Sequence, residues 1–153
     1  MEADDVQAAI DFIREYADRS HHAKEEDLLF PAMGEAGFPP EGGPVAVMLG
    51  EHDEGRAYVT SMEEGLQQYR EGEEAGASIM AEGAKGYVGL LDQHIQKENQ
   101  ALYPMADNAL SETTQADLRK KFDKLNDDPD YAANVRRHEQ ALQRLEEKYA
   151  ARS

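Results

Sequence analysis

Apolar residues recur at helical spacing along five stretches of the chain. Their period predicts helices at about residues 4–30, 44–69, 79–103, 111–125 and 129–149. Pro31 and the Pro- and Gly-rich segment 34–44 are expected to end the first helix and form a loop, because proline lacks a backbone N–H. We find no stretch that alternates apolar and polar residues as a strand would. The pattern therefore predicts an all-α fold, built as an up-down helical bundle.

Histidine and glutamate side chains accompany the apolar face of the first helix. That face is formed by residues that cluster at about 100° per residue, namely Val6, Ile10, Ile13, Ala17 and Leu28. On the same helical wheel, His21 and Glu25 lie near the edge of the apolar face. His22 and Glu26 are turned about 100° further, toward solvent. The first helix is therefore expected to direct the pair His21 and Glu25 inward.

The second and third helices add polar residues at inward positions. In the second helix, His52 falls on a face with apolar residues, namely Val45, Met48 and Val59. In the third helix, His94 and Glu98 fall on the apolar face, which also holds Leu90, Leu91, Ile95 and Leu102. Three helices are thus expected to direct imidazoles toward one interior, and two of them add a carboxylate one turn later.

The first and third helices carry the same short motif. HHAKEEDLLFP begins at His21 and HIQKENQALYP begins at His94. In both, a His is followed by a Lys, then by a Glu four residues after the His, and finally by apolar residues and a Pro. A His and a Glu four residues apart share one helical face, and although one such pair arises by chance, the repetition indicates two halves of a metal site. The matching Lys24 and Lys97 are expected to be outward charges.

A cation would offset the cost of burying these groups. A buried carboxylate without a partner costs several kcal/mol or takes up a proton. Carboxylates and neutral imidazoles suit iron, manganese or zinc better than calcium or magnesium. We therefore expect a centre of two non-haem iron ions bridged by Glu25 and Glu98, with manganese or zinc as substitutes.

Composition narrows the class of protein. The chain of 153 residues is expected to form a single domain. It has no cysteine, which excludes disulfides, thiolate-held clusters and cysteine nucleophiles. Its 32 acidic and 16 basic residues give a formal net charge of -16, which argues against nucleic acid and anionic membranes as partners. No apolar run is long enough to cross a bilayer, so a cytoplasmic location is expected.

The motifs resemble those of the hemerythrin-like family, the HHE cation-binding domains. The resemblance covers residues 6–110 through HHAKEEDLLFP, the GGP loop, VMLGEHDEGR and HIQKENQALYPMAD. Residues 111–150 would then be a helical extension of the single domain 1–153. Matched residue by residue, the resemblance implies five metal ligands: His21, Glu25, His52, His94 and Glu98. His22, Glu26 and His138 are weaker candidates.

The resemblance implies a di-iron bundle, its ions joined by an oxo bridge, for reversible binding of O2 or NO, sensing, or iron handling. The resemblance thus favours a metal- and gas-binding protein over a turnover enzyme. Two alternatives stay open. One is a di-iron redox enzyme, either peroxidase- or oxidase-like or an iron-donating repair protein. The other is a helical interaction protein with a depleted metal site.

The chain departs from the family at its start. Members usually begin with a further helix that carries one or two more ligating histidines, whereas this chain starts with the helix of His21. The last helix could fill that place, since it has an apolar stripe of Val135, His138, Leu142, Leu145 and Tyr149. A second copy in a homodimer could also fill it. A shortened start is the third alternative.

Overall fold

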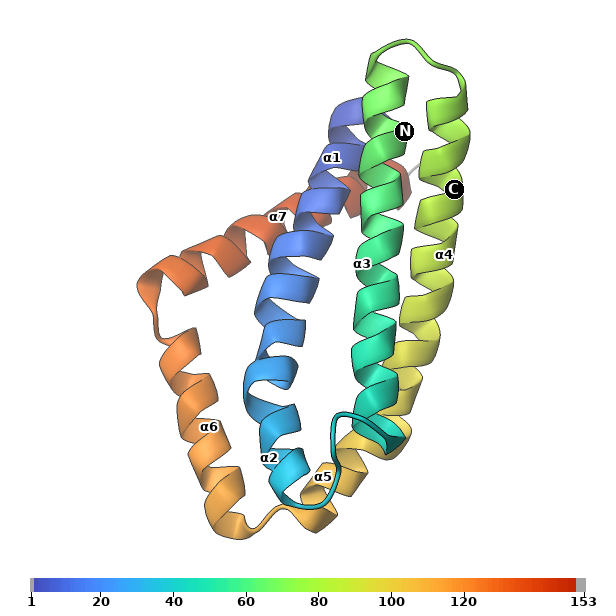
Figure 1. Ribbon diagram of the computed structural model, residues 1–153. Coiled ribbons are helices and arrows are strands. Elements are labelled where there is room, and N and C mark those ends of the chain that lie inside the picture. The colour runs from blue at the N-terminus through green and yellow to red at the C-terminus, as the bar shows by residue number, and fades with distance from the viewer. Residues whose placement is uncertain (1, 151–153) are drawn as a thin grey trace.

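The computed structural model describes residues 2–150, and within this range the regular elements are all helices. The predicted all-α fold is confirmed, and the long helices form a bundle (Figure 1). None of these helices combines the length and the apolar character that crossing a bilayer requires.

The first helical arm runs without a break from Ala3 to Glu35. It alternates between α-helix and the wider π-helix, in which each N–H bonds to the carbonyl five residues before it. Its segments are α1 (Ala3–Phe12), η1 (Ile13–His22), η2 (Glu25–Leu29) and α2 (Phe30–Glu35). Two π-helical segments therefore fall in the part of the arm that carries the first motif.

The second and third arms form an antiparallel pair. The second arm is α3 (Gly43–Arg70), and the third comprises α4 (Ala75–Lys97), the π-helical η3 (Glu98–Leu102) and α5 (Tyr103–Ala109). Figure 1 shows α3 and α4 side by side along most of their length, which requires close backbone approach. A Cβ atom at Gly76 would overlap the backbone of Gly65 and Tyr69, so glycine allows the two helices to approach there.

Neither proline of the repeated motif ends its helix. The prediction that Pro31 would end the first arm is wrong, since the arm continues to Glu35, and the third arm likewise passes through Pro104 to Ala109. Both prolines follow a π-helical segment, in which Phe30 N–H bonds to the carbonyl of Glu25 and Tyr103 N–H to that of Glu98. The wider turn changes the hydrogen-bond register just before the residue that lacks an N–H, and the helix continues.

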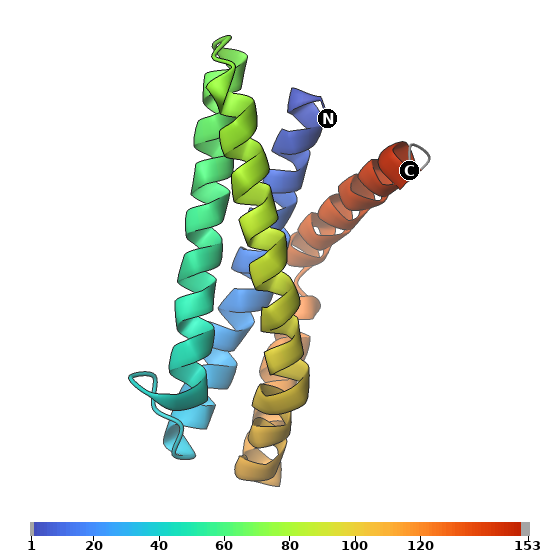
Figure 2. The same ribbon diagram turned by 90° about the vertical axis from the view of Figure 1, so that its right-hand side faces the viewer.

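The C-terminal part forms two further helices, α6 (Glu112–Asn126) and α7 (Pro129–Ala150). Ser111 caps α6 by accepting a hydrogen bond from Thr114 N at 3.2 Å, and Asp128 accepts one from Tyr131 N at 2.8 Å. Helix α7 packs against α1 and η1, whereas α6 packs against η2. Figure 2 shows that α7 runs obliquely to the long arms, so it covers the first arm without becoming a parallel fourth helix.

The buried residues form two apolar clusters with a polar layer between them. The lower cluster contains Phe30, Met33, Val45, Met48, Leu102, Ala106, Leu110 and Leu118. The upper cluster contains Ile10, Val59, Met62, Leu66 and Tyr87. Along each of the three arms, the buried histidine and glutamate positions fall between the residues of these two clusters. The apolar clusters thus exclude water above and below the polar layer.

Candidate metal centre

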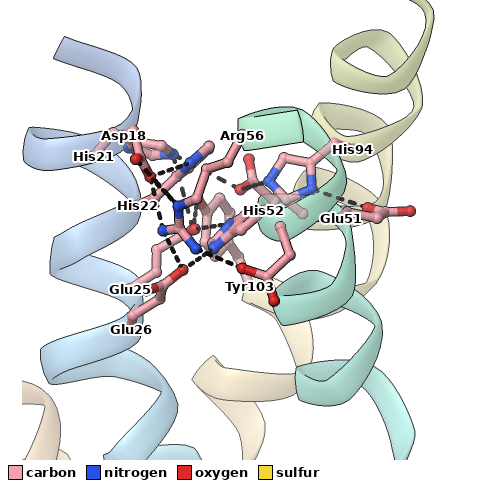
Figure 3. A network of polar contacts seen from close by, with 12 residues as sticks. Asp18, His21, His22, Glu25, Glu26, Glu51, His52, Arg56, His94 and Tyr103 are labelled. Carbon is pink, nitrogen blue, oxygen red and sulfur yellow. Dashed lines mark hydrogen bonds and ion pairs between the residues drawn. The ribbon is translucent and has the colours of Figure 1, made fainter. Parts of the chain in front are cut away.

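Four buried side chains from three arms converge in the polar layer. They are Glu25 of η2, His52 of α3, His94 of α4 and Glu98 of η3. One potential ligand atom from each lies within 4.8 Å of those of the other three. Figure 3 shows this cluster between the first arm and the α3–α4 pair. Because the chain has no cysteine, the donors are nitrogen and oxygen.

The donor atoms of this cluster face one another at ion-pair distances, but none of them forms a hydrogen bond within the described residues. The unpartnered buried atoms include Glu25 Oε2, His52 Nε2, His94 Nε2 and Glu98 Oε1. Leaving a buried polar atom unsatisfied costs about 1–3 kcal/mol, and here four such atoms face one small volume. A bound cation would satisfy them all at once, so the residues present fit a metal.

The inner nitrogens of His52 and His94 each face a glutamate, His52 on another arm and His94 one turn along its own arm. His52 Nε2 lies 3.2 Å from Glu25 Oε2, and His94 Nε2 lies 2.9 Å from Glu98 Oε1. His21 lies at the edge, with its Nε2 at 3.8 Å from Glu25 and 3.7 Å from Glu98. The side chain of His21 is 49% exposed, which places it at the solvent side of the cluster.

The other nitrogen of each buried histidine meets a second carboxylate. His52 Nδ1 lies 2.7 Å from Glu26, and His94 Nδ1 lies 2.9 Å from Glu51. A basic residue stands behind each carboxylate: Arg56 donates to Glu26 at 2.8 Å, and Lys97 pairs with Glu51. A carboxylate bonded to the outer nitrogen of a metal-binding histidine fixes the orientation of the ring and the tautomer that presents a lone pair inward. Both imidazoles are therefore held for a metal.

Arg56 joins this support to a third histidine. It donates two hydrogen bonds to Asp18 Oδ1, at 3.0 Å from Nε and 2.7 Å from Nη2. Asp18 lies 3.4 Å from Nδ1 of His22, which is buried and stacked on His52 with ring centroids 3.9 Å apart. The carboxylates of Asp18 and Glu26 raise the pKa of Arg56. Arg56 is therefore a permanent cation that holds two carboxylates in place.

Tyr103 and an adjoining cavity define the open side of the cluster. The hydroxyl of Tyr103 donates to Glu25 Oε1 at 2.8 Å, and burial and the Glu25 carboxylate raise the pKa of Tyr103. A cavity of about 520 Å³ reaches His21, Glu25 and Tyr103 from the side of α6. This cavity gives small molecules a route from solvent to the donor atoms.

The neighbouring imidazoles favour the ionised form of Glu98. Burial alone would raise the pKa of Glu98, but the imidazoles of His21 and His94 hold it well below its usual value. Burial would lower the pKa of His94, but Glu98 and Glu51 raise it. Glu98 likewise raises the pKa of His21. Metal binding by an imidazole requires its neutral form, so a bound cation would compete with protons for these histidines.

The helical-wheel placement of the His21–His22 pair is wrong in orientation. His22 is 7% exposed and packs inside, whereas His21 is half exposed. Glu26 is partly buried against His52 and does not point freely to solvent. The wheel assumed about 100° per residue, but η1 turns less per residue because it is π-helical. The smaller angle per residue adds up along η1, and by the end of the segment it has turned His22 toward the interior.

The other sequence candidates fall in different places. His138 is buried on α7 beside Ala8, Asp11 and Glu15 of the first arm, and it is not part of the donor cluster. Lys24 donates to Asn126 of α6 at 2.9 Å, and Ile95, expected on the apolar face, is 44% exposed.

Sequence reasoning missed the residues that support the histidines: Asp18, Glu51, Arg56 and Tyr103. Glu51 directly precedes His52 but supports His94 on another helix. Arg56 lies four residues after His52, a spacing that places it on the same face of α3. That spacing, and the same spacing between Asp18 and His22, are local signals that could have pointed to the network.

Comparisons with known proteins agree with this geometry. The model of the hemerythrin HHE cation binding domain matches residues 1–106. Similar curated proteins include the iron-sulfur cluster repair protein YtfE of Salmonella newport (strain SL254), Salmonella heidelberg (strain SL476) and Salmonella agona (strain SL483), each 34% identical over 89 residues. The match covers 57% of this chain, and the chain spans 40% of the length of these relatives. No solved structure matches the chain. Since the family model covers more than half of its residues, the chain belongs to the hemerythrin HHE cation-binding domain family.

Proposed function

We propose that the chain is a non-haem di-iron protein that binds a small ligand such as O2 or NO. In this proposal His21, Glu25, His52, His94 and Glu98 hold the two ions, and the two glutamates bridge them. The observation that carries the proposal is the convergence of four buried, unpartnered donor atoms from Glu25, His52, His94 and Glu98. Nitrogen and carboxylate donors suit iron, with manganese and zinc as competitors.

The residues around the donors prepare the site. Glu26 and Glu51 accept the outer N–H of His52 and His94, so that the inner nitrogens keep their lone pairs. Tyr103 orients Glu25 by donating to one carboxylate oxygen and leaving the other free to bind. Bound iron would supply redox chemistry and open coordination positions for a small ligand. The chain itself supplies orientation and a layer protected from water by the two apolar clusters.

Tyr87 adds a donor next to the imidazoles. Its hydroxyl is buried and has no partner within the described residues, and Tyr87 lines a small cavity together with His22, His52 and His94. Burial raises the pKa of Tyr87 to about 12, so the hydroxyl keeps its proton at neutral pH.

A second candidate function is iron handling in the repair of iron-sulfur clusters. The half-exposed His21 and the cavity of about 520 Å³ at Glu25 favour it, because an open edge permits metal exchange with an acceptor. The curated relatives are named iron-sulfur cluster repair proteins. In this role the chain would bind and release iron without turning over a substrate.

Anaerobic loading with iron(II) followed by two measurements tests the proposal. Small-ligand binding predicts two iron ions per chain and visible bands that appear with NO or O2 and are reversed when the ligand is removed. Iron handling predicts fast transfer of iron to an apo-protein acceptor and a slower transfer when His21 is replaced by Phe. A chain that holds no iron after loading contradicts both.

A further inference from the structure

His22 is buried among the imidazoles of the donor cluster. Its ring stacks on His52 with centroids 3.9 Å apart and planes 12° apart, and it meets His94 edge-on at 5.6 Å. One potential ligand atom of His22 lies within 4.8 Å of those of His52 and His94. His52 and His94 therefore belong both to this group and to the group with the two glutamates.

The backbone explains why two consecutive histidines reach the same site. Neighbouring residues of an α-helix differ by about 100° in direction, which normally sends one of a pair outward. The segment η1 ends at His22 and is π-helical, so the angle between neighbours is smaller. His21 reaches Glu25 and Glu98 from the solvent side, while His22 enters beside His52.

A carboxylate also lies behind His22, as it does behind the other two buried histidines. Asp18 lies 3.4 Å from Nδ1 of His22 without a hydrogen bond, whereas Glu26 and Glu51 are hydrogen-bonded to Nδ1 of His52 and His94. Arg56 binds both Asp18 and Glu26, so one cation secures the carboxylates behind two neighbouring imidazoles. His22 therefore keeps a buried ring nitrogen without a hydrogen-bond partner within the described residues, as His52 and His94 do.

We propose that His22 is a further ligand of the metal centre, which η1 delivers to the side of His52 and His94. This inference rests on the proposed di-iron function and goes beyond its five ligands. The first arm then contributes both histidines of the His21–His22 pair and the carboxylate of Glu25.

Replacing His22 by Phe separates ligation from packing. His22→Phe keeps a flat ring on His52 and removes the nitrogen donors. The expected result is loss of one of two iron ions, or iron binding weakened more than tenfold in competition with a chelator. The spectrum of the cobalt(II)-loaded protein is expected to change as well, because a nitrogen donor is lost. The matched control is His138→Phe, which alters a buried histidine outside the cluster and is expected to keep two ions.

A second variant, tested with added imidazole, keeps the inference testable if His22→Phe folds poorly. The variant His22→Ala leaves a space beside His52, and added imidazole is expected to restore the second ion and the cobalt spectrum. The inference is overturned if His22→Phe holds two ions with unchanged affinity and spectrum. It is also overturned if added imidazole does not restore the second ion to His22→Ala. Either result leaves the proposed function standing. Wild-type chain that binds no metal overturns both.

Discussion

Nδ1 of His52 lies 2.7 Å from Oε1 of Glu26, while the inner nitrogen of the same ring faces the carboxylate of Glu25. Two consecutive glutamates of η2 thus meet opposite edges of one imidazole. The inner carboxylate is a candidate ligand, and the outer one fixes the ring. Glu25 and Glu26 therefore have different roles, and their replacement is expected to have different effects.

Replacing Glu26 by Gln is expected to weaken metal binding about 10–100-fold without removing a ligand. The amide no longer supplies a negative charge to His52 and Arg56, so the ring loses its preferred tautomer. Competition with a chelator measures the affinity. Asp27→Asn is the matched control, because Asp27 is the next residue and is exposed. Equal affinities for Glu26→Gln and wild type would show that the contact does not support the site.

The two motif lysines are expected to differ, although they occupy matching positions. Lys97 pairs with Glu51, the carboxylate behind His94, whereas Lys24 donates to Asn126. Lys97→Met is therefore expected to weaken metal binding several-fold, because Glu51 loses its counter-charge, and Lys24→Met is expected to leave it unchanged. Parallel metal titrations of both variants measure this. A loss of affinity in Lys24→Met as large as in Lys97→Met would refute the assignment of Lys97.

Alanine at two glycines of α4 is expected to have opposite effects on stability. At Gly76 a Cβ would overlap the backbone of α3, and Gly76→Ala is expected to lower the free energy of unfolding by about 1–3 kcal/mol. Nothing lies within 4 Å of a Cβ at Gly89, so Gly89→Ala is expected to raise it by about 0.5–1 kcal/mol through helix propensity. Urea unfolding measures both. A stable Gly76→Ala would contradict the close approach of α3 and α4.

Docking of α7 on α1 is expected to depend on pH through Asp5. Lys148 donates to Asp5 at 2.7 Å and, together with the hydroxyl of Tyr149, holds the pKa of Asp5 below its usual value of 3.8. A carboxyl whose pKa is lower in the folded state stabilises that state at pH values above its pKa in the unfolded chain. This stabilisation is lost as the pH falls through the pKa of the folded state. The melting temperature of wild type should exceed that of Asp5→Asn near neutral pH. The difference should shrink below pH 3.8, and a constant difference would contradict the assignment.

Helical period alone predicts the fold and the inward placement of His52, His94 and Glu98, because α3 and α4 are regular α-helices up to those positions. It fails at His21 and His22, where η1 changes the angle per residue. Proline chemistry fails in the same way at Pro31, since a π-helical segment precedes it. Sequence periodicity assumes one helix type, and both errors come from the change of type.

The supporting contacts between different arms could not be predicted from local spacing. Glu51 and His94 are 43 positions apart, and Arg56 and Asp18 are 38 apart. Each pair forms only when two arms pack side by side at one register. Because the sequence does not reveal that register, it shows the metal-donor residues but not the residues that orient them.

Metal content per chain tests the central claim most directly. Plasma mass spectrometry on wild type loaded with iron(II) is expected to find about two ions. Glu25→Gln and Glu98→Gln are each expected to retain one or none, and Asp27→Asn is expected to retain two. Wild type without bound iron, or both glutamate variants with the full two ions, would contradict a metal centre built on these carboxylates.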